Sequence, residues 1–182
     1  VCGRARMQPR VAESARTGDK CQATRRGSDV RQVGRSAGRT ATTGQAQQVL
    51  LRGACKDACV QLQAISRMEA YGTGTALGDP IEVGALTSAV VAEQRPGDSL
   101  MCSGIKANIG HGESTAGASG LLWLMLCVAT GEAAPHAQLR FLNPRVYSSS
   151  RGAPHMMPCH VSTAGPALKV CASRIGCVSS FG

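Results

Sequence analysis

The pattern of apolar and polar residues predicts an α-helix in three stretches of the chain. In residues 45–58, apolar side chains stand at helical intervals between good helix formers. A second helix is expected from Pro80 to about residue 93, because proline fits the first turn of a helix, where its missing N–H is not needed. Residues 115–130 are apolar on nearly every face, which is typical of a helix buried in a larger assembly.

Two short apolar runs predict strands, and each leads into a polar loop. Residues 64–70 precede a Gly- and Thr-rich turn at 71–78, and residues 99–105 precede a loop at 106–112. The order of strand, loop and helix therefore occurs twice. In open α/β sheets, functional sites lie at loops that follow the C-terminal ends of strands, so these two loops are the candidate sites.

The rest of the chain shows less pattern. Residues 131–173 are expected to be loop with one or two short strands, and residues 177–181 a last strand. Residues 1–26 show neither helical nor strand periodicity and are left unassigned. Ordered structure is expected to begin near Gly27. Because no methionine stands at Val1 and no terminal tail follows Gly182, the chain is interpreted as a fragment.

Composition favours tightly packed α/β layers. The 182 residues are enough for one domain with a core, 43% are hydrophobic, only 3% are aromatic, and 22 are glycine. The core must therefore use Ala, Val, Leu and Ile. The longest apolar run, at 121–130, is too short to span a bilayer, so no membrane association is predicted.

Most of the net charge of +9 lies near the N-terminus. Residues 1–40 hold ten Lys or Arg against three acidic residues. A solvated, disordered basic tail at 1–26 is the preferred interpretation. Nucleic-acid binding and a transit peptide are the alternatives. Because the stretch lacks aromatic residues for stacking, no nucleic-acid partner is predicted.

The nine cysteines are odd in number and contain no Cys-x-x-Cys pair. The alternatives are a disulfide scaffold, a zinc site, and reduced thiols that pack as small hydrophobic residues. The last interpretation is preferred, and no metal site is predicted.

Both candidate loops carry groups that can act chemically. Glycines let the 71–78 turn bring backbone N–H groups close to a ligand, but the spacing fits neither nucleotide-phosphate motif, Gly-x-x-x-x-Gly-Lys-Ser/Thr or Gly-x-Gly-x-x-Gly. Lys106, Asn108 and His111 offer a cation, an amide and an imidazole within a short arc. A single loop histidine is also often structural, so both interpretations of His111 remain open on the residues alone.

The two loops together resemble β-ketoacyl synthases, most of all those of modular type I polyketide synthases. The motifs are Glu-Ala-Tyr-Gly-Thr-Gly-Thr-Ala-Leu-Gly-Asp-Pro at 69–80 and Lys-Ala-Asn-Ile-Gly-His at 106–111. Further similarity covers residues 27–36, 44–48 and 178–182, so the resemblance spans 27–182, with its core at 44–130 and weaker agreement at 150–173. It implies a thiolase-like α/β fold, mainly its C-terminal half, in which a mixed sheet packs between helices.

The resemblance also implies a reaction and partners. The family joins an acyl thioester on an active-site cysteine to a malonyl unit on an acyl carrier protein by decarboxylative Claisen condensation, in polyketide or fatty-acid biosynthesis. No directly bound cofactor is implied, since the phosphopantetheine arm of the carrier presents the substrate. The implied partners are the acyl carrier protein, the remainder of the synthase and a second copy in a homodimer. The implied location is cytoplasmic, with a plastid as the alternative.

Individual residues take roles from the same resemblance. His111 would donate a hydrogen bond to the malonyl thioester carbonyl, and Lys106 would order the site electrostatically with Glu113 as a partner. Tyr71 stands where the family has its first catalytic histidine. The expected supporting residues are Thr73, Thr75, Asp79, Glu82, Asn108, Glu113 and Phe181.

Two departures from the family pattern lower the expected activity. A phenol at residue 71 is a poor substitute for an imidazole, because its pKa is near 10 and its reach is longer. The Thr-Ala-Cys-Ser-Ser type segment that carries the family nucleophile is absent from the sequence. The chain alone is therefore expected to lack condensing activity. The alternative function is a non-elongating ketosynthase-like module that binds acyl carriers or dimerises without catalysis.

Overall fold

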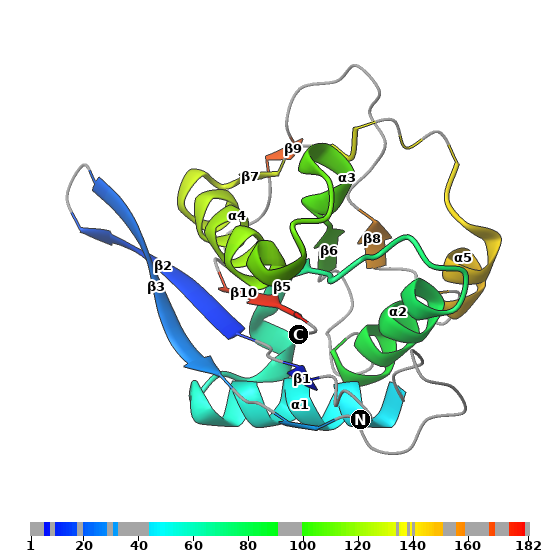
Figure 1. Cartoon of the computed structure of the whole chain (residues 1–182). Coiled ribbons are helices and arrows are strands. Elements are labelled where there is room, and N and C mark those ends of the chain that lie inside the picture. The colour runs from blue at the N-terminus through cyan, green and yellow to red at the C-terminus, as the bar shows by residue number, and fades with distance from the viewer. Residues whose placement is uncertain are drawn as a thin grey trace.

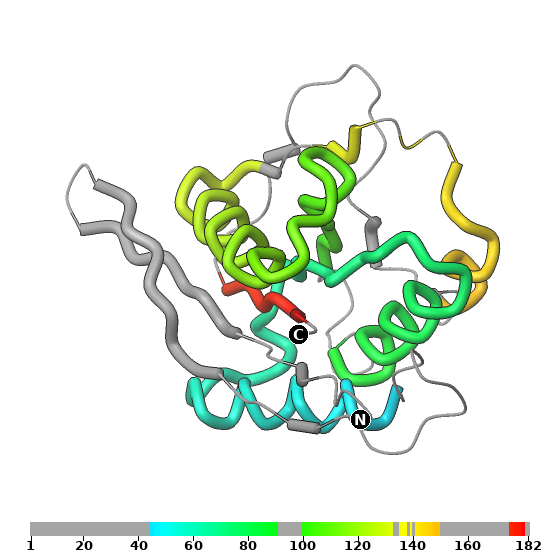
Figure 2. Tube along the Cα trace, viewed as in Figure 1, coloured from blue at the N-terminus to red at the C-terminus, as the bar shows by residue number. Residues whose placement is uncertain are grey.

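A computed structural model gives the fold of the chain (Figures 1 and 2). The residues that it describes are 6–7, 10–17, 20–28, 31–32, 44–90, 100–133, 135–137, 139, 141–150, 156–158, 168–169 and 175–180.

The centre of the fold is a six-stranded mixed sheet with the order β3-β2-β10-β5-β6-β8. Its strands are β2 (Arg10–Thr17), β3 (Lys20–Ser28), β5 (Ile65–Glu69), β6 (Leu100–Ser103), β8 (Met156–Pro158) and β10 (Ile175–Val178). The four strands from β10 to β8 are parallel, whereas β2 and β3 pair antiparallel at one side. The C-terminal ends of β10, β5 and β6 therefore meet at one edge of the sheet.

Two pairs of very short strands lie outside this sheet. In one, β1 (Arg6–Met7) pairs with β4 (Arg31–Gln32), and in the other, β7 (Glu132–Ala133) pairs with β9 (Leu168–Lys169).

Helices cover the sheet on both faces (Figure 1). On one face lie α1 (Gly44–Asp57), α2 (Gly78–Ala89) and α5 (Pro144–Ser150), and on the other lies α4 (Ala116–Thr130). A single turn of helix, α3 (Lys106–Ile109), follows β6, and 3₁₀ turns occupy Leu62–Ala64 and Glu113–Thr115. No helix in the described part of the chain is long and apolar enough to cross a membrane.

Neighbouring residues of the strands supply the two sides of the core. Leu100 packs in the cluster formed with α1 and α2, whereas Met101 packs against Trp123 and Cys127 of α4. In the same way, Cys177 packs in the cluster with α1 and α2, whereas the next residue, Val178, packs against α4. This alternation follows from the two-residue period of a strand. It produces three layers, with the parallel strands buried between helices.

Most predicted elements agree with the structure. The helices expected at 45–58 and 115–130 are α1 and α4, and the strands expected at 64–70 and 99–105 contain β5 and β6. The second expected helix is α2, which begins two residues before Pro80, and the proposed continuation beyond Val90 lies outside the described residues. The last expected strand, at 177–181, begins earlier, at Ile175.

Three predictions were wrong. Residues 1–26 were expected to be a disordered tail, but the described backbone of 10–17 and 20–28 forms two strands that extend the central sheet. The loop expected at 106–112 contains the α3 turn. Residues 131–173 were expected to hold only loop and short strands, but they also contain α5. In all three cases hydrophobic periodicity is weak, so pairing and packing with distant segments determine the conformation.

The two faces of α4 predict different costs of truncation. Leu124 is 2% exposed and packs on Val178, whereas Leu122 is 68% exposed. Leu124→Ala is expected to lower the free energy of unfolding by about 2–5 kcal/mol, through lost burial and a cavity. The matched control Leu122→Ala is expected to change it by no more than about 0.5 kcal/mol. Urea denaturation measures both, and equal losses would contradict the placement of α4.

Candidate functional site

The two polar loops lie side by side because their strands are parallel neighbours. Glu69 at the end of β5 is in register with Ser103 at the end of β6, and the backbone N–H of Ala70 donates to the Ser103 carbonyl at 2.7 Å. The turn at 71–77 and the segment at 104–112 therefore leave the same edge of the sheet. Ser179, just after β10, reaches the same edge, where its N–H donates to the Glu69 carbonyl at 3.0 Å.

The buried carboxylate of Glu82 holds the first loop in place. It accepts hydrogen bonds from the backbone N–H of Tyr71 at 2.7 Å and of Gly72 at 3.0 Å, and from the Ser179 hydroxyl. Glu82 is 4% exposed, and burial raises its pKa, while its hydrogen bonds to Gly72, Ser179 and Tyr71 oppose that rise. One side chain of α2 thus joins the 71–77 turn to the end of β10.

A second buried carboxylate, Glu69, holds the loop after β6. Its oxygens accept from the Ser103 hydroxyl and from the Ile105 backbone N–H, both at 2.5 Å. Burial raises its pKa to about 7, although both hydrogen bonds and the charge of Lys106 act in the opposite direction. Because Ile105 directly precedes Lys106, Glu69 fixes the point from which the lysine leaves the backbone.

Glycine permits the conformation of the first turn. Gly72 has φ +50° and Gly74 has φ +76°, values that side-chain-bearing residues rarely adopt. In this conformation the Gly74 N–H donates to the Asp79 carboxylate at 3.2 Å, and the Thr75 hydroxyl accepts from the Gly78 N–H at 3.0 Å. Burial raises the pKa of Asp79. Asp79 and Thr75 therefore join the turn to the start of α2.

Tyr71, Lys106 and His111 contact one another where the two loops meet. The Tyr71 hydroxyl lies 3.1 Å from His111 Nε2, and the two rings meet edge to face with centroids 5.6 Å apart. The Lys106 Nζ lies 4.2 Å from the centre of the Tyr71 ring, which is a cation–π contact. Burial lowers the pKa of Lys106, and the nearby carboxylates of Glu69 and Glu82 oppose that lowering.

The backbone fixes which nitrogen of His111 carries the proton. The Glu113 N–H donates to His111 Nδ1 at 2.8 Å, so Nδ1 acts as an acceptor and the neutral ring carries its proton on Nε2. Glu113 adopts φ +42°, a conformation that is uncommon for a residue with a side chain. This backbone position sets the hydrogen bond that determines the tautomer.

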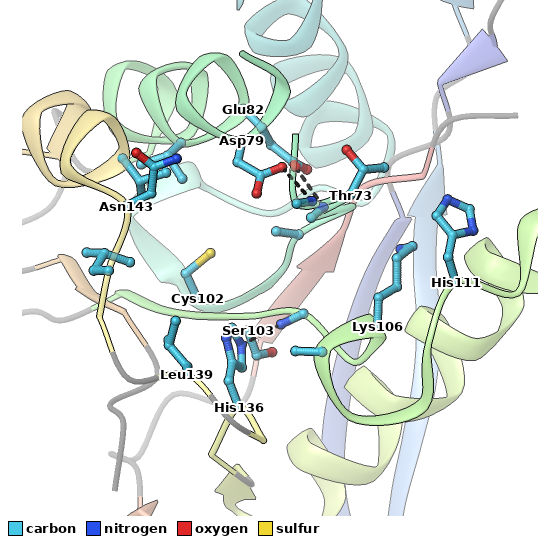
Figure 3. A pocket seen from close by; sticks show the side chains of 18 of the residues that line it. Thr73, Asp79, Glu82, Cys102, Ser103, Lys106, His111, His136, Leu139 and Asn143 are labelled. Carbon is cyan, nitrogen blue, oxygen red and sulfur yellow. Dashed lines mark hydrogen bonds between the residues drawn. The ribbon is translucent and has the colours of Figure 1, made fainter. Parts of the chain in front are cut away.

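A pocket of about 540 Å³ opens between the two loops and α5. Figure 3 shows Thr73, Lys106 and His111 on one side of it and Leu139 and Asn143 on the other, with Cys102 between them. Val83, Leu142 and Val146 add apolar surface to its wall. The pocket therefore combines a cation and an imidazole at one side with an apolar wall at the other.

The segment after β7 closes a further side of the pocket. His136 lines the pocket, and its Nε2 accepts from the Gly104 N–H at 2.9 Å. Burial lowers the pKa of His136, which favours the neutral ring that this acceptor role requires. Asn108 donates to the Pro135 carbonyl at 3.2 Å and accepts from the Ala137 N–H at 2.7 Å. Asn108 thus holds this segment against α3.

Seven of the ten predicted site residues line the pocket or hold its walls. Thr73, Asp79, Glu82, Lys106 and His111 line the pocket, whereas Thr75 and Asn108 hold its walls through hydrogen bonds. The pairing of Lys106 with Glu113 stays a prediction, and among the described residues the carboxylates whose charge raises the pKa of Lys106 are Glu69 and Glu82. Phe181 lies outside the described residues.

Sequence reasoning missed several residues of the site, chiefly Glu69, Ser103, His136, Asn143 and Ser179. Glu69, Ser103 and Ser179 each stand at or just after the C-terminal end of a parallel strand, so their position in the pattern was a usable signal. His136 and Asn143 follow no periodic pattern, and only the fold brings them to the pocket.

Comparison with known proteins shows which family the chain resembles. Residues 22–140 match the family model described as β-ketoacyl synthase, C-terminal domain. A highly reducing polyketide synthase, cm3B, of the fungus Cordyceps militaris is 38% identical over 151 residues, which are 83% of this chain and 6% of that protein. Erythronolide synthase EryA3 of Saccharopolyspora erythraea is 43% identical over 123 residues, which are 68% of this chain and 4% of that protein.

Solved structures give the same result. The oxazolomycin ketosynthase domain OzmH KS7 of Streptomyces albus JA3453 superposes with a TM-score of 0.65 at 29% identity, over 76% of this chain and 24% of that domain's chain. This likeness confirms the expected α/β, thiolase-like fold. The chain spans only a small part of these relatives, 6% of the fungal synthase and 24% of the ketosynthase structure.

The raised pKa of Glu69 predicts how stability depends on pH. A carboxyl with a pKa of 4.5 when unfolded and about 7 when folded binds a proton more tightly in the folded chain. Its contribution to stability is therefore present below pH 4.5 and is lost as the pH rises through 7, by about 3 kcal/mol in total. Glu69→Gln is expected to remove this loss, so its stability relative to wild type should rise between pH 5 and pH 8.

Urea denaturation at both pH values measures this difference. Glu132→Gln is the control, because it removes a carboxylate that is exposed. If Glu69→Gln and the wild-type chain lose stability in parallel between pH 5 and pH 8, the inference that folding raises the pKa of Glu69 is wrong.

Proposed function

The chain belongs to the β-ketoacyl synthase C-terminal domain family, and from this membership we propose that it forms the second half of a ketosynthase domain in a polyketide synthase. Its pocket would receive the malonyl unit that an acyl carrier protein presents on its phosphopantetheine arm. The remainder of the synthase would supply the acyl-bearing cysteine. A homodimeric assembly and a cytoplasmic location, with a plastid as the alternative, belong to the same proposal.

The observation that carries this proposal is the convergence of Lys106 and His111 on one pocket. The two residues leave the sheet from the same loop, and both line the cavity on the same side as Thr73. An enolate that forms from a malonyl thioester needs a hydrogen-bond donor at its carbonyl oxygen. His111 is suited to that role, because its tautomer places the proton on Nε2.

The proposed reaction uses these groups in a defined order. The bond between C2 of the malonyl unit and its carboxylate breaks, CO₂ leaves, and the electron pair forms the enolate of the thioester. C2 then attacks the acyl carbonyl, the C–S bond to the cysteine breaks, and the thiolate departs. Lys106 would attract the malonyl carboxylate to the pocket, and His111 Nε2 would donate to the carbonyl oxygen that gains negative charge.

A second candidate function has specific support from Tyr71. Its hydroxyl lies within hydrogen-bond distance of His111 Nε2, the nitrogen that a thioester carbonyl would need. In a non-elongating module, the chain would bind acyl-loaded carriers in the same pocket without catalysing condensation.

Charge recognition at the pocket gives a direct binding test. Malonyl-pantetheine is expected to bind the chain more tightly than acetyl-pantetheine, which lacks the carboxylate. Lys106→Ala is expected to weaken malonyl-pantetheine binding by roughly tenfold, the loss of one charge-assisted contact, and to remove the preference. Isothermal titration calorimetry measures the affinity of the wild-type chain and of each variant for both thioesters. Lys56→Ala is the control, because Lys56 is an exposed residue of α1. Equal binding of both thioesters by wild type would refute the proposal.

Condensation gives a second test. The 182-residue chain, incubated with malonyl- and acyl-loaded carrier protein, is expected to yield no β-ketoacyl product, because its sequence lacks the segment that carries the family nucleophile. Mass spectrometry of the carrier measures the product. Its detection would show that one of the chain's own cysteines serves as the nucleophile.

A further inference from the structure

Tyr71 contacts both of the pocket's candidate functional groups with different parts of its side chain. Its hydroxyl lies 3.1 Å from His111 Nε2, and its ring lies under the Lys106 ammonium at 4.2 Å. The neighbouring Ala70 and Gly72 line the pocket together with Lys106 and His111. Tyr71 is therefore placed to act on the site through these two residues.

The direction of the hydrogen bond between Tyr71 and His111 follows from the backbone. His111 Nδ1 accepts the Glu113 N–H at 2.8 Å, so the neutral imidazole has its proton on Nε2. The Nε2–H therefore donates, and the Tyr71 oxygen accepts. Burial and then the charge of Glu82 raise the pKa of Tyr71, so the acceptor is a neutral phenol.

The turn keeps Tyr71 in this place independently of its side chain. The Tyr71 backbone N–H donates to Glu82 at 2.7 Å and to the Ser179 hydroxyl at 3.1 Å. A substitution at residue 71 therefore alters the contacts with Lys106 and His111 while leaving these anchors available. This makes the side-chain role separable from the fold.

We propose that Tyr71 is a positioning residue that withholds His111 from the pocket: its phenol oxygen binds the Nε2 proton, and its ring holds Lys106 beside it. The proposal rests on the function proposed above, because a thioester carbonyl would compete with the phenol oxygen for the same proton. A ligand must break this hydrogen bond before His111 can donate to it. The phenol thus lowers the affinity of the site for a thioester, because the ligand must first break one neutral hydrogen bond.

Three variants separate the two contacts. Tyr71→Phe removes the oxygen and keeps the ring under Lys106, whereas Tyr71→Leu removes both. Tyr147→Phe is the matched control, because it removes a phenol oxygen from a tyrosine of α5 that is 54% exposed. If Tyr71→Leu fails to fold, the comparison of Tyr71→Phe with Tyr147→Phe still decides the role of the oxygen.

Nuclear magnetic resonance of ¹⁵N-histidine-labelled chain tests the contact without any ligand. In wild type and Tyr147→Phe, His111 is expected to show the Nε2–H tautomer with an Nε2 proton that exchanges slowly with water. In Tyr71→Phe the tautomer should persist, because Glu113 sets it, and the proton should exchange faster. An Nδ1–H tautomer in wild type, or an unchanged exchange rate in Tyr71→Phe, would overturn the proposal.

Titration with malonyl-pantetheine tests the consequence. Tyr71→Phe is expected to bind it roughly two- to tenfold more tightly than wild type, the value of one released neutral hydrogen bond, with Tyr147→Phe unchanged. Equal or weaker binding by Tyr71→Phe would refute the withholding role. If no variant binds malonyl-pantetheine, the proposed function fails, and the exchange rate of the His111 proton alone decides the contact with Tyr71.

Discussion

Two buried carboxylates are the constraint on which the site depends. Glu82 and Glu69 are 4% and 1% exposed, and each accepts backbone N–H groups of a loop at the C-terminal edge of the sheet. Burial of a carboxylate is costly unless hydrogen bonds satisfy its oxygens. The loops supply those donors, so the loop conformation and the burial of the carboxylates stabilise each other. Neither loop can move without leaving an acidic group unsatisfied in the interior.

This arrangement explains how the site keeps its shape with a tyrosine at residue 71. Glu82 binds the backbone of Tyr71 and Gly72, and Glu113 binds His111 through its own backbone N–H. The geometry of both loops therefore depends on main-chain groups and on the positive φ of the glycines. The side chain of residue 71 can change the chemistry of the pocket while the fold persists. Membership of the family and catalytic competence are separate properties of this chain.

Much of the fold could be predicted because its signals are local. The apolar stripe of α1, the apolar α4 and the short runs before the two loops were sufficient to place these elements and to bring the loops to one edge of the sheet. The strands β2 and β3 lacked such a signal, since they are basic and take their place by pairing with each other and with β10. The helix α5 packs on α2, a contact that no local pattern encodes.

The candidate site was predictable where it lay within the two motifs. Lys106, His111, Asp79 and Glu82 could be named because they stand in the two motifs that resemble the family, whereas Glu69, one of the two carboxylates that act on Lys106, could not. Glu113 is near Lys106 in sequence, but Glu69 is in register with Ser103 across two strands, and only the sheet pairing reveals that proximity. His136 reaches the pocket through a contact with Gly104, 32 residues away in the chain.

Native-state amide hydrogen exchange tests the role of the buried carboxylates most directly, because it requires no substitution and no ligand. The N–H groups of Tyr71, Gly72 and Ile105 lie in loops but donate to Glu82 and Glu69. They are expected to exchange as slowly as the amides of β5 and β6, and to become exposed only when the sheet opens. Exchange at the rate of an exposed turn would contradict the account.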